Sequence, residues 1–341
     1  MIIHARAYPR VGLVGNPSDG YFGKTIALVF RNFQAEVLLY ETPELEILPA
    51  QRDRSVFQSV DALAEDVCKY GYYGGIRLVK AAIKRFRDHC RENGLSLSGA
   101  NFTIRYRTNI PHHVGLGGSS AIITACFRAL MRFHEVQIEP PVLANLILSV
   151  EQDELGIRAG LQDRVVQVYE GLVYMDFDRE LMARRGYGRY EYLPARTLPH
   201  LYVAYRTDLA EGSEVFHNNI RERFDRGERP VVEAMRYWAR LTDRARTALE
   251  AGDKDRLGSL LDANFNRRRK IYHLSEANRA MVETARNAGA SAKFAGSGGA
   301  IVGTYADQGM YTRLKAALRG CKVRVFKPRL VAPARSTKET P

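Results

Sequence analysis

The sequence lacks the features that would mark a membrane, secreted or zinc-binding protein. No apolar run in its 341 residues approaches the ~20 residues of a membrane span, and the first residues lack the apolar core of a signal peptide. The four cysteines are scattered and form no Cys-x-x-Cys pair, which argues against structural zinc and a disulfide framework. Internal repeats and low-complexity tracts are also missing. These absences predict a globular protein of the reducing cytoplasm that does not bind membranes.

Charge of one sign is in moderate excess but is not concentrated. Lysine and arginine number 51 against 38 acidic residues, which gives a net charge of +13, and the densest basic run is 267–270. A nucleic-acid-binding surface usually gathers its charge on one face with aromatic residues between. An anionic small substrate with a nucleotide explains the excess equally well, so composition leaves both kinds of partner open. The length suits one large or two medium domains.

A glycine-rich stretch at 111–121, Pro-His-His-Val-Gly-Leu-Gly-Gly-Ser-Ser-Ala, is the strongest local signal. It leads directly into an apolar helical run at 121–127. Glycines allow a sharp turn and a close backbone approach, and the unpaired N–H groups of a helix start attract anions. The stretch therefore indicates a phosphate-binding loop, although a helix N-terminus after a tight turn has the same local pattern. No Gly-Lys-[Ser/Thr] closes it, so it is not a Walker loop.

Hydrophobic patterning gives a mixed order of helices and strands. Strands are predicted at 10–15, at 25–30 paired with 35–40, at 101–108 and at 301–303. Helices are predicted over 57–93 with an interruption at 72–75, from 140 to 154, and from 164 into a strand that ends at 176. Residues 179–188 indicate a linker. The stretch 16–21 has the composition of a simple hairpin turn.

Three motifs together resemble the GHMP kinases, the family of galacto-, homoserine, mevalonate and phosphomevalonate kinases. Residues 10–19, Arg-Val-Gly-Leu-Val-Gly-Asn-Pro-Ser-Asp, are similar to the first family motif. Residues 111–121 resemble the second motif, and 293–300, Lys-Phe-Ala-Gly-Ser-Gly-Gly-Ala, a shortened third motif. The resemblance implies an α+β fold: a domain with a left-handed βαβ unit at 1–190, a ferredoxin-like domain at 191–330 and a disordered tail at 331–341.

The same resemblance implies the residues of an active site that uses ATP and Mg²⁺. Asp163 matches the catalytic carboxylate, Arg10 the arginine at the transferred phosphate, and Ser119 and Glu151 the ligands of Mg²⁺. Taken alone, Asp163 has the sequence context of a turn residue or helix N-cap. The nucleotide phosphates would be held by Pro111, Gly115, Leu116, Gly117, Gly118, Ser119, Ser120, Ala121, Gly296, Ser297 and Gly298. The substrate would be held by Asn16, Asp19, Tyr21, Asp163, Arg164 and Arg268.

The chemistry needs these groups in one pocket. Phosphoryl transfer depends on in-line positioning and charge neutralisation more than on covalent catalysis. We therefore expect the carboxylate of Asp163, the guanidinium of Arg10 and the amides near Ser119 to converge. In this arrangement Asp163 would accept or orient the proton of the attacking hydroxyl.

A narrower resemblance is to plant-type glucuronokinases. It rests on residues 10–19, 71–75, 108–111, 160–164 and 293–299. It implies transfer of phosphate from ATP to the anomeric oxygen of D-glucuronate, giving glucuronate 1-phosphate. The sugar carboxylate would then meet Arg164 or the basic run at 267–269.

Other functions stay open at this stage. They are a GHMP kinase for galacturonate, galactose or a heptose phosphate, and a non-catalytic sensor with the same fold. We expect a monomer or homodimer whose partners are small molecules rather than nucleic acid.

Overall fold

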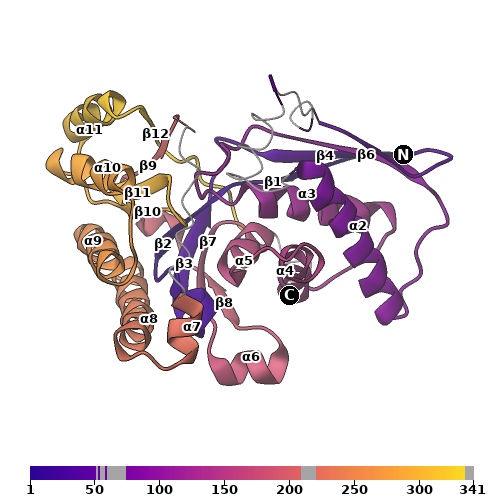
Figure 1. Ribbon diagram of the computed structural model, residues 1–341, viewed down its shortest axis with the longest axis horizontal. Helices are drawn as coiled ribbons and strands as arrows, with labels where there is room; N and C mark the ends of the chain where they lie inside the picture. The colour runs from indigo at the N-terminus through magenta and orange to yellow at the C-terminus, as the bar shows by residue number, and fades with distance from the viewer. Residues whose placement is uncertain (51–52, 54–57, 60–73, 209–219, 335–341) are drawn as a thin grey trace. The chain divides into compact units, whose positions relative to one another are not determined.

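The computed structural model describes residues 1–50, 53, 58–59, 74–208 and 220–334, which form two compact units that alternate along the chain (Figure 1). The first unit comprises 1–9, 33–110 and 117–168, and the second comprises 10–32, 111–116 and 169–341. The chain passes from one unit to the other inside the glycine-rich stretch, between Leu116 and Gly117.

The first unit is a four-stranded sheet with helices on one side. Its strands are β1 (Ile2–Ala7), β4 (Ala35–Glu41), β6 (Phe102–Thr108) and β5 (Glu46–Leu48) in that order, with β5 parallel to β6 and the others antiparallel. Helix α2 (Gly75–Glu92) lies between β5 and β6 in the chain, so the three form the predicted βαβ unit; its left hand stays a prediction.

Helix α3 (Gly118–Phe133) packs against β1 and β4 and alongside α2. It is followed by α4 (Pro140–Ser149), the π-helix η3 (Val150–Glu154) and α5 (Leu161–Tyr169). The helices of this unit pack together because their apolar residues recur at helical spacing and so lie on one face. Leu78, Val79, Ala82 and Phe86 form the buried stripe of α2.

The second unit contains two antiparallel sheets. One has the order β2 (Arg10–Val14), β3 (Lys24–Val29), β7 (Leu172–Asp176) and β8 (Arg189–Tyr192). The other has the order β10 (Lys293–Phe294), β11 (Ala300–Thr304), β9 (Leu201–Arg206) and β12 (Val323–Phe326). Numbered along the chain, the second order is 2-3-1-4, which is the ferredoxin-like arrangement predicted for the C-terminal part.

Helices cover both sheets of the second unit. Helix α8 (Arg229–Glu250) packs on β2 and β3, and α9 (Lys254–Ile271) packs on α8 and β10. Phe265 of α9, Val282 of α10 (Glu276–Asn287) and Leu314 of α11 (Gln308–Gly320) share one core with Tyr202 and Phe294 of the sheet. Within the described residues, the other elements are η1 (Ser18–Tyr21), α6 (Arg179–Arg185), η4 (Ala195–Thr197) and α7 (Ile220–Asp225).

Two local predictions are wrong and two regions remain untested. The strands at 24–29 and 35–41 do not pair: β3 lies between β2 and β7, whereas β4 lies between β1 and β6. Local patterning locates a strand but does not select its neighbours. The predicted linker at 179–188 contains α6, whose first amides are capped by the Asp178 side chain.

Parts of the predicted helix at 57–93 and of the tail at 331–341 lie outside the described residues. Within the tail, Val331 and Ala334 donate backbone hydrogen bonds to Val29 and Tyr169. The single domain boundary near residue 190 stays a prediction. Among the described helices, none has the length and apolar character to cross a membrane.

Candidate active site

The glycine-rich stretch forms a turn that opens directly into α3. Gly115 and Gly117 have φ values of 67° and 75°, in the left-handed region that favours glycine. Gly117 immediately precedes the helix, and its carbonyl accepts the first helical hydrogen bond, from the amide of Ala121. The amides of Gly118, Ser119 and Ser120 precede the first donor of the helical ladder. The start of α3 therefore has the properties of an anion site.

A buried chain of charged groups lies beside this helix start in the first unit. The Ser119 hydroxyl donates a 2.8 Å hydrogen bond to Glu151 Oε1, and Arg164 forms an ion pair with Glu151 Oε2. The side chains of Glu151 and Arg164 are only 2% and 4% exposed. Asp163 is the next member of this series of interacting side chains, because its Oδ2 lies 3.7 Å from Arg164 Nη1. Four predicted site residues, Ser119, Glu151, Arg164 and Asp163, are thus brought together, with Arg164 as the shared counter-charge.

The position of Glu151 depends on an element that was not predicted. The α4 pattern was expected to run to residue 154 as one helix, but η3 takes over at Val150. Such π-helical turns are frequent at functional sites, and this one carries Glu151 into the interior.

Gln167, also not predicted, ties α5 to the glycine loop. Its amide group donates to the carbonyl of Gly117 at 2.8 Å and to that of Tyr8 at 3.0 Å. The available signal was its position four residues after Asp163, which places the two residues on the same face of one helix.

In the second unit, Arg10 lies between two glycine loops. Its Nη1 donates to the Gly115 carbonyl at 2.5 Å, and its own amide donates to the Leu116 carbonyl. A Cβ placed on Gly296 would come within 2.3 Å of the Gly115 oxygen and 2.9 Å of Arg10 Nη1. The absence of a side chain at Gly296 is therefore what lets the loops and the guanidinium meet.

The loop at 295–299 is held from behind by Arg268 of α9. Arg268 donates to the carbonyls of Gly296 and Ser297 at 2.8 and 3.1 Å. Burial lowers the pKa of Arg268, while Tyr272 and Asp19 oppose that shift. The amide of Gly299 donates to Asn278 Oδ1, which fixes the far end of the loop.

A buried amine supports the predicted substrate loop. Lys293 is 1% exposed and donates at 2.6 Å to both the Gly12 carbonyl and Asn16 Oδ1. Burial, followed by the nearby Arg268 and Arg10, holds the pKa of Lys293 well below its usual value. Asn264 accepts from the Gly15 amide and donates to the Asn16 carbonyl. Sequence patterns missed both Lys293 and Asn264 as supports of this loop, because their partners lie about 250 or more positions away along the chain.

The predicted site residues divide between the two units. The first unit holds Gly117, Gly118, Ser119, Ser120, Ala121, Glu151, Asp163 and Arg164. The second holds Arg10, Asn16, Asp19, Tyr21, Pro111, Gly115, Leu116, Arg268, Gly296, Ser297 and Gly298. Convergence of the two sets on one ligand stays a prediction.

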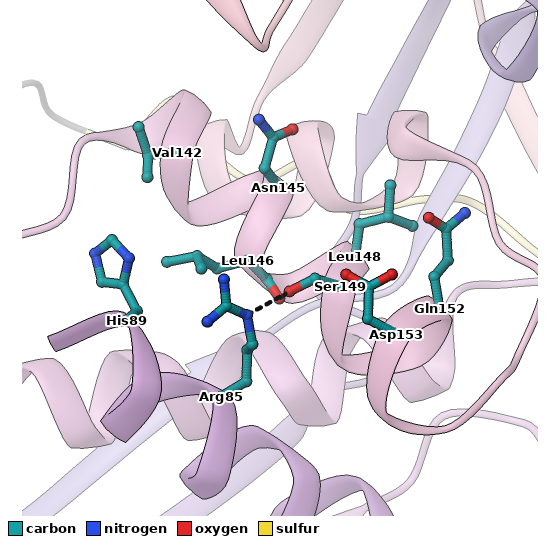
Figure 2. Close-up of a pocket in the computed structure, with 9 residues that line it drawn as sticks. All are labelled: Arg85, His89, Val142, Asn145, Leu146, Leu148, Ser149, Gln152 and Asp153. Carbon is teal, nitrogen blue, oxygen red and sulfur yellow. Dashed lines mark hydrogen bonds between the residues drawn. The ribbon is translucent and has the colours of Figure 1, made fainter. Parts of the chain in front are cut away.

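A pocket of about 400 Å³ lies elsewhere in the first unit (Figure 2). Arg85 of α2 projects into it and donates to the Ser149 hydroxyl at 3.1 Å. The nine described residues that line this pocket include none of the predicted site residues.

Comparisons with known proteins agree with the family resemblance and with the fold. The family model of the GHMP kinase N-terminal domain matches residues 77–171. Glucuronokinase 1 of Arabidopsis thaliana is 43% identical over 88% of this chain and 84% of its own, and probable glucuronokinase 2 is 44% identical over the same shares. The structure of Lactococcus lactis galactokinase with galactose superposes with a TM-score of 0.75 at 15% identity, covering 96% of this chain and 93% of that one.

The chain therefore belongs to the GHMP kinases, a family of phosphotransferases that act on small molecules. The predicted α+β fold is confirmed.

Proposed function

We propose that the protein is an ATP-dependent sugar-acid kinase that transfers the γ-phosphate of ATP to the anomeric oxygen of D-glucuronate, giving glucuronate 1-phosphate. The observation that carries the proposal is the identity of 43–44% with two glucuronokinases over 88% of the chain. The aligned part of the chain is long enough to include predicted site residues of the first unit and of the second unit.

The phosphates of ATP would be bound by backbone amides. The start of α3 offers unpaired N–H groups and the positive end of the helix dipole. The turn at Gly115 and Gly117 leaves no Cβ in the way of a phosphate. Gly115 belongs to the second unit and Gly117 to the first, and they are only two residues apart. The backbone of this loop therefore links the site residues of the second unit to those of the first.

Ser119 and Glu151 fit the requirements of Mg²⁺. Their oxygens lie 2.8 Å apart, and no group of three or more His, Cys, Asp and Glu side chains suited to a metal occurs in the described part of the chain. Mg²⁺ is usually held by one or two protein oxygens and completes its shell with phosphates and water. When bound, the ion would neutralise phosphate charge as the transfer proceeds.

Asp163 would take the proton of the sugar hydroxyl. As this proton moves to a carboxylate oxygen, the anomeric oxygen bonds to the γ-phosphorus, the bond from that phosphorus to the β–γ bridging oxygen breaks, and ADP leaves. General-base help of this kind contributes about 10²–10⁴-fold in rate. Arg164 Nη1, 3.7 Å from Asp163 Oδ2, places a fixed positive charge beside this carboxylate.

Arg10 and the 16–19 loop would position the reactants. Arg10 is fixed by Gly115 and would present its guanidinium charge to the transferred phosphate. Asn16 and Asp19 would bind sugar hydroxyls. Lys293 and Asn264 hold the loop that carries them, so positioning supplies rate beyond that from Asp163.

Compartment and assembly belong to the same proposal. The described cysteines, Cys90, Cys126 and Cys321, are free thiols, which supports a reducing cytoplasm. We propose a monomer or homodimer that acts on small molecules and not on nucleic acids or membranes.

The direct test measures ADP release by a coupled assay with D-glucuronate, D-galacturonate, D-galactose and mevalonate side by side. We expect glucuronate to give the highest kcat/KM. A higher value with galacturonate or galactose would establish the second candidate, a GHMP kinase for another sugar. No ADP release with any sugar would instead favour a sensor, although the retention of Asp163, Glu151 and Ser119 argues against that class.

A further inference from the structure

A sugar acid differs from a neutral sugar by its carboxylate, which needs a cationic partner. The arginines predicted for this role have donors committed elsewhere. Arg164 pairs with Glu151 and donates to the Gly160 carbonyl, and Arg268 donates to two carbonyls of the 295–299 loop. The inference that follows rests on the proposed function and asks which other cation lies beside the substrate loop.

The turn η1 carries Asp19, and cations of the second unit surround it. Lys24 is paired with Asp243 at 2.9 Å and lies 3.7 Å from Asp176, so its charge is balanced within the protein. Two guanidinium groups lie over aromatic rings of the turn. Arg221 lies 4.4 Å from the ring centroid of Tyr21, and Arg179 lies 4.3 Å from that of Phe22.

Arg221 is fixed in orientation and also accessible. Its Nη2 donates to the carbonyl of Gly20, the residue after Asp19, and the ring of Tyr21 supports its plane. Phe224, from the same helix α7, packs edge-on to Tyr21 with centroids 4.9 Å apart. The Arg221 side chain is 48% exposed, and its Nη1 forms an ion pair at 3.9 Å with Asp225, whose side chain is 59% exposed. An ion pair between exposed side chains is weak, so a ligand carboxylate can compete with Asp225 for this guanidinium.

This geometry suits recognition of a carboxylate. A guanidinium has five N–H donors in a planar fork that matches a carboxylate, and the Gly20 bond uses one edge only. Stacking on Tyr21 restricts the side chain before the ligand arrives, which reduces the entropy lost on binding. Arg179 has the same stacked contact but a different aromatic partner, and no bond to Gly20 is described for it.

We propose that Arg221 binds the carboxylate of the sugar acid while the adjacent Asp19 binds its hydroxyls, so that Arg221 selects sugar acids over neutral sugars. A carboxylate on C5 of a pyranose lies across the ring from the hydroxyls on C2 and C3. Asp19 of η1 and Arg221 of α7, which contacts Gly20 and Tyr21 of the same turn, can therefore bind the two features from different sides of the sugar.

The test compares D-glucuronate with D-glucuronamide, in which a neutral amide replaces the carboxylate. Steady-state kinetics are measured for the wild type, Arg221→Gln, Arg221→Lys and the matched control Arg179→Gln. We expect Arg221→Gln to raise KM for glucuronate by about 10- to 100-fold, the range for a hydrogen-bonded charge pair. KM for glucuronamide and for ATP should change less than about 2-fold. Arg221→Lys should recover part of the loss, because it keeps the charge but not the fork.

The other outcomes overturn the assignment in distinguishable ways. An equal loss with glucuronate and glucuronamide would mean that Arg221 only supports the turn, and a lowered melting temperature would accompany it. The same selective loss in Arg179→Gln but not in Arg221→Gln would move the carboxylate site to Arg179. A wild type that phosphorylates neither compound would refute the proposed function itself.

Discussion

The two sets of site residues hold their charges in opposite ways. In the first unit, Glu151, Arg164 and Asp163 form a chain in which acids and a base compensate each other. In the second unit, the cations Arg10, Arg268 and Lys293 donate instead to backbone carbonyls or an amide oxygen.

This contrast predicts different consequences for substitutions. Removing one partner of a buried ion pair leaves an uncompensated charge, which is strongly destabilising. Where cations bind loop carbonyls, a substitution changes the shape of a loop and the local positive charge that would attract phosphates. Variants of the first unit should therefore act through charge balance, and variants of the second through loop geometry.

The largest effect is expected for Asp163→Asn. The amide keeps the size of the side chain but cannot take up the hydroxyl proton, so kcat should fall by about 10²–10⁴-fold. ATP binding and the melting temperature should stay close to wild type. A fully active variant would remove Asp163 from its proposed role.

Breaking the ion pair in the first unit should affect stability most. Arg164→Met leaves Glu151 buried with no counter-charge from Arg164, and we expect the free energy of unfolding in urea to fall by about 3–5 kcal/mol. The control is Arg229→Gln, which removes an ion pair with Glu233 whose side chains are 88% and 48% exposed. That loss should be too small to resolve by urea unfolding, because both side chains of the pair are exposed. Equal losses in the two variants would contradict the contrast between buried and exposed pairs.

Loop geometry in the second unit is tested by Gly296→Ala. The added Cβ cannot fit 2.3 Å from the Gly115 oxygen, so the two loops must separate. A displacement of about 1 Å in a catalytic group can reduce activity by about 10²-fold, and we expect a kcat/KM loss of that order. Gly320→Ala is the control, because a Cβ there has no atom within 4 Å. Wild-type kinetics for Gly296→Ala would show that the close approach of the loops is not needed.

The smallest predicted effect is the pH dependence contributed by Lys293. Its folded-state pKa is lowered, so below pH 10.5 the unfolded chain binds a proton that the folded chain resists. The stability of the wild type relative to Lys293→Met should therefore rise as pH increases from the lowered folded-state pKa toward 10.5, by at most about 1.4 kcal/mol per pH unit. Urea unfolding of both proteins at several pH values measures the difference, and a difference that stays constant with pH would contradict a buried, easily deprotonated amine.

Local features of both regions were predictable from the sequence. Periodic apolar residues located helices such as α2. Glycine positions marked both loops because only glycine permits the left-handed turn or the close approach found there.

Long-range partners were not predictable from local patterns. The neighbours of β3 and β4 depend on strands far away in the chain. Lys293 contacts Asn16 across 277 residues, and Arg164 binds Glu151 through a π-helical turn that has no clear sequence signature. The residues that carry chemistry were thus easier to identify than the residues that hold them in place.

The central claim is transfer of phosphate to the anomeric oxygen of a sugar acid. Phosphorus NMR of the product formed from ATP and D-glucuronate tests it most directly. We predict a sugar phosphate whose phosphorus couples to the anomeric proton, formed together with ADP. A phosphate coupled to another ring proton, or ADP without any sugar phosphate, would contradict the account.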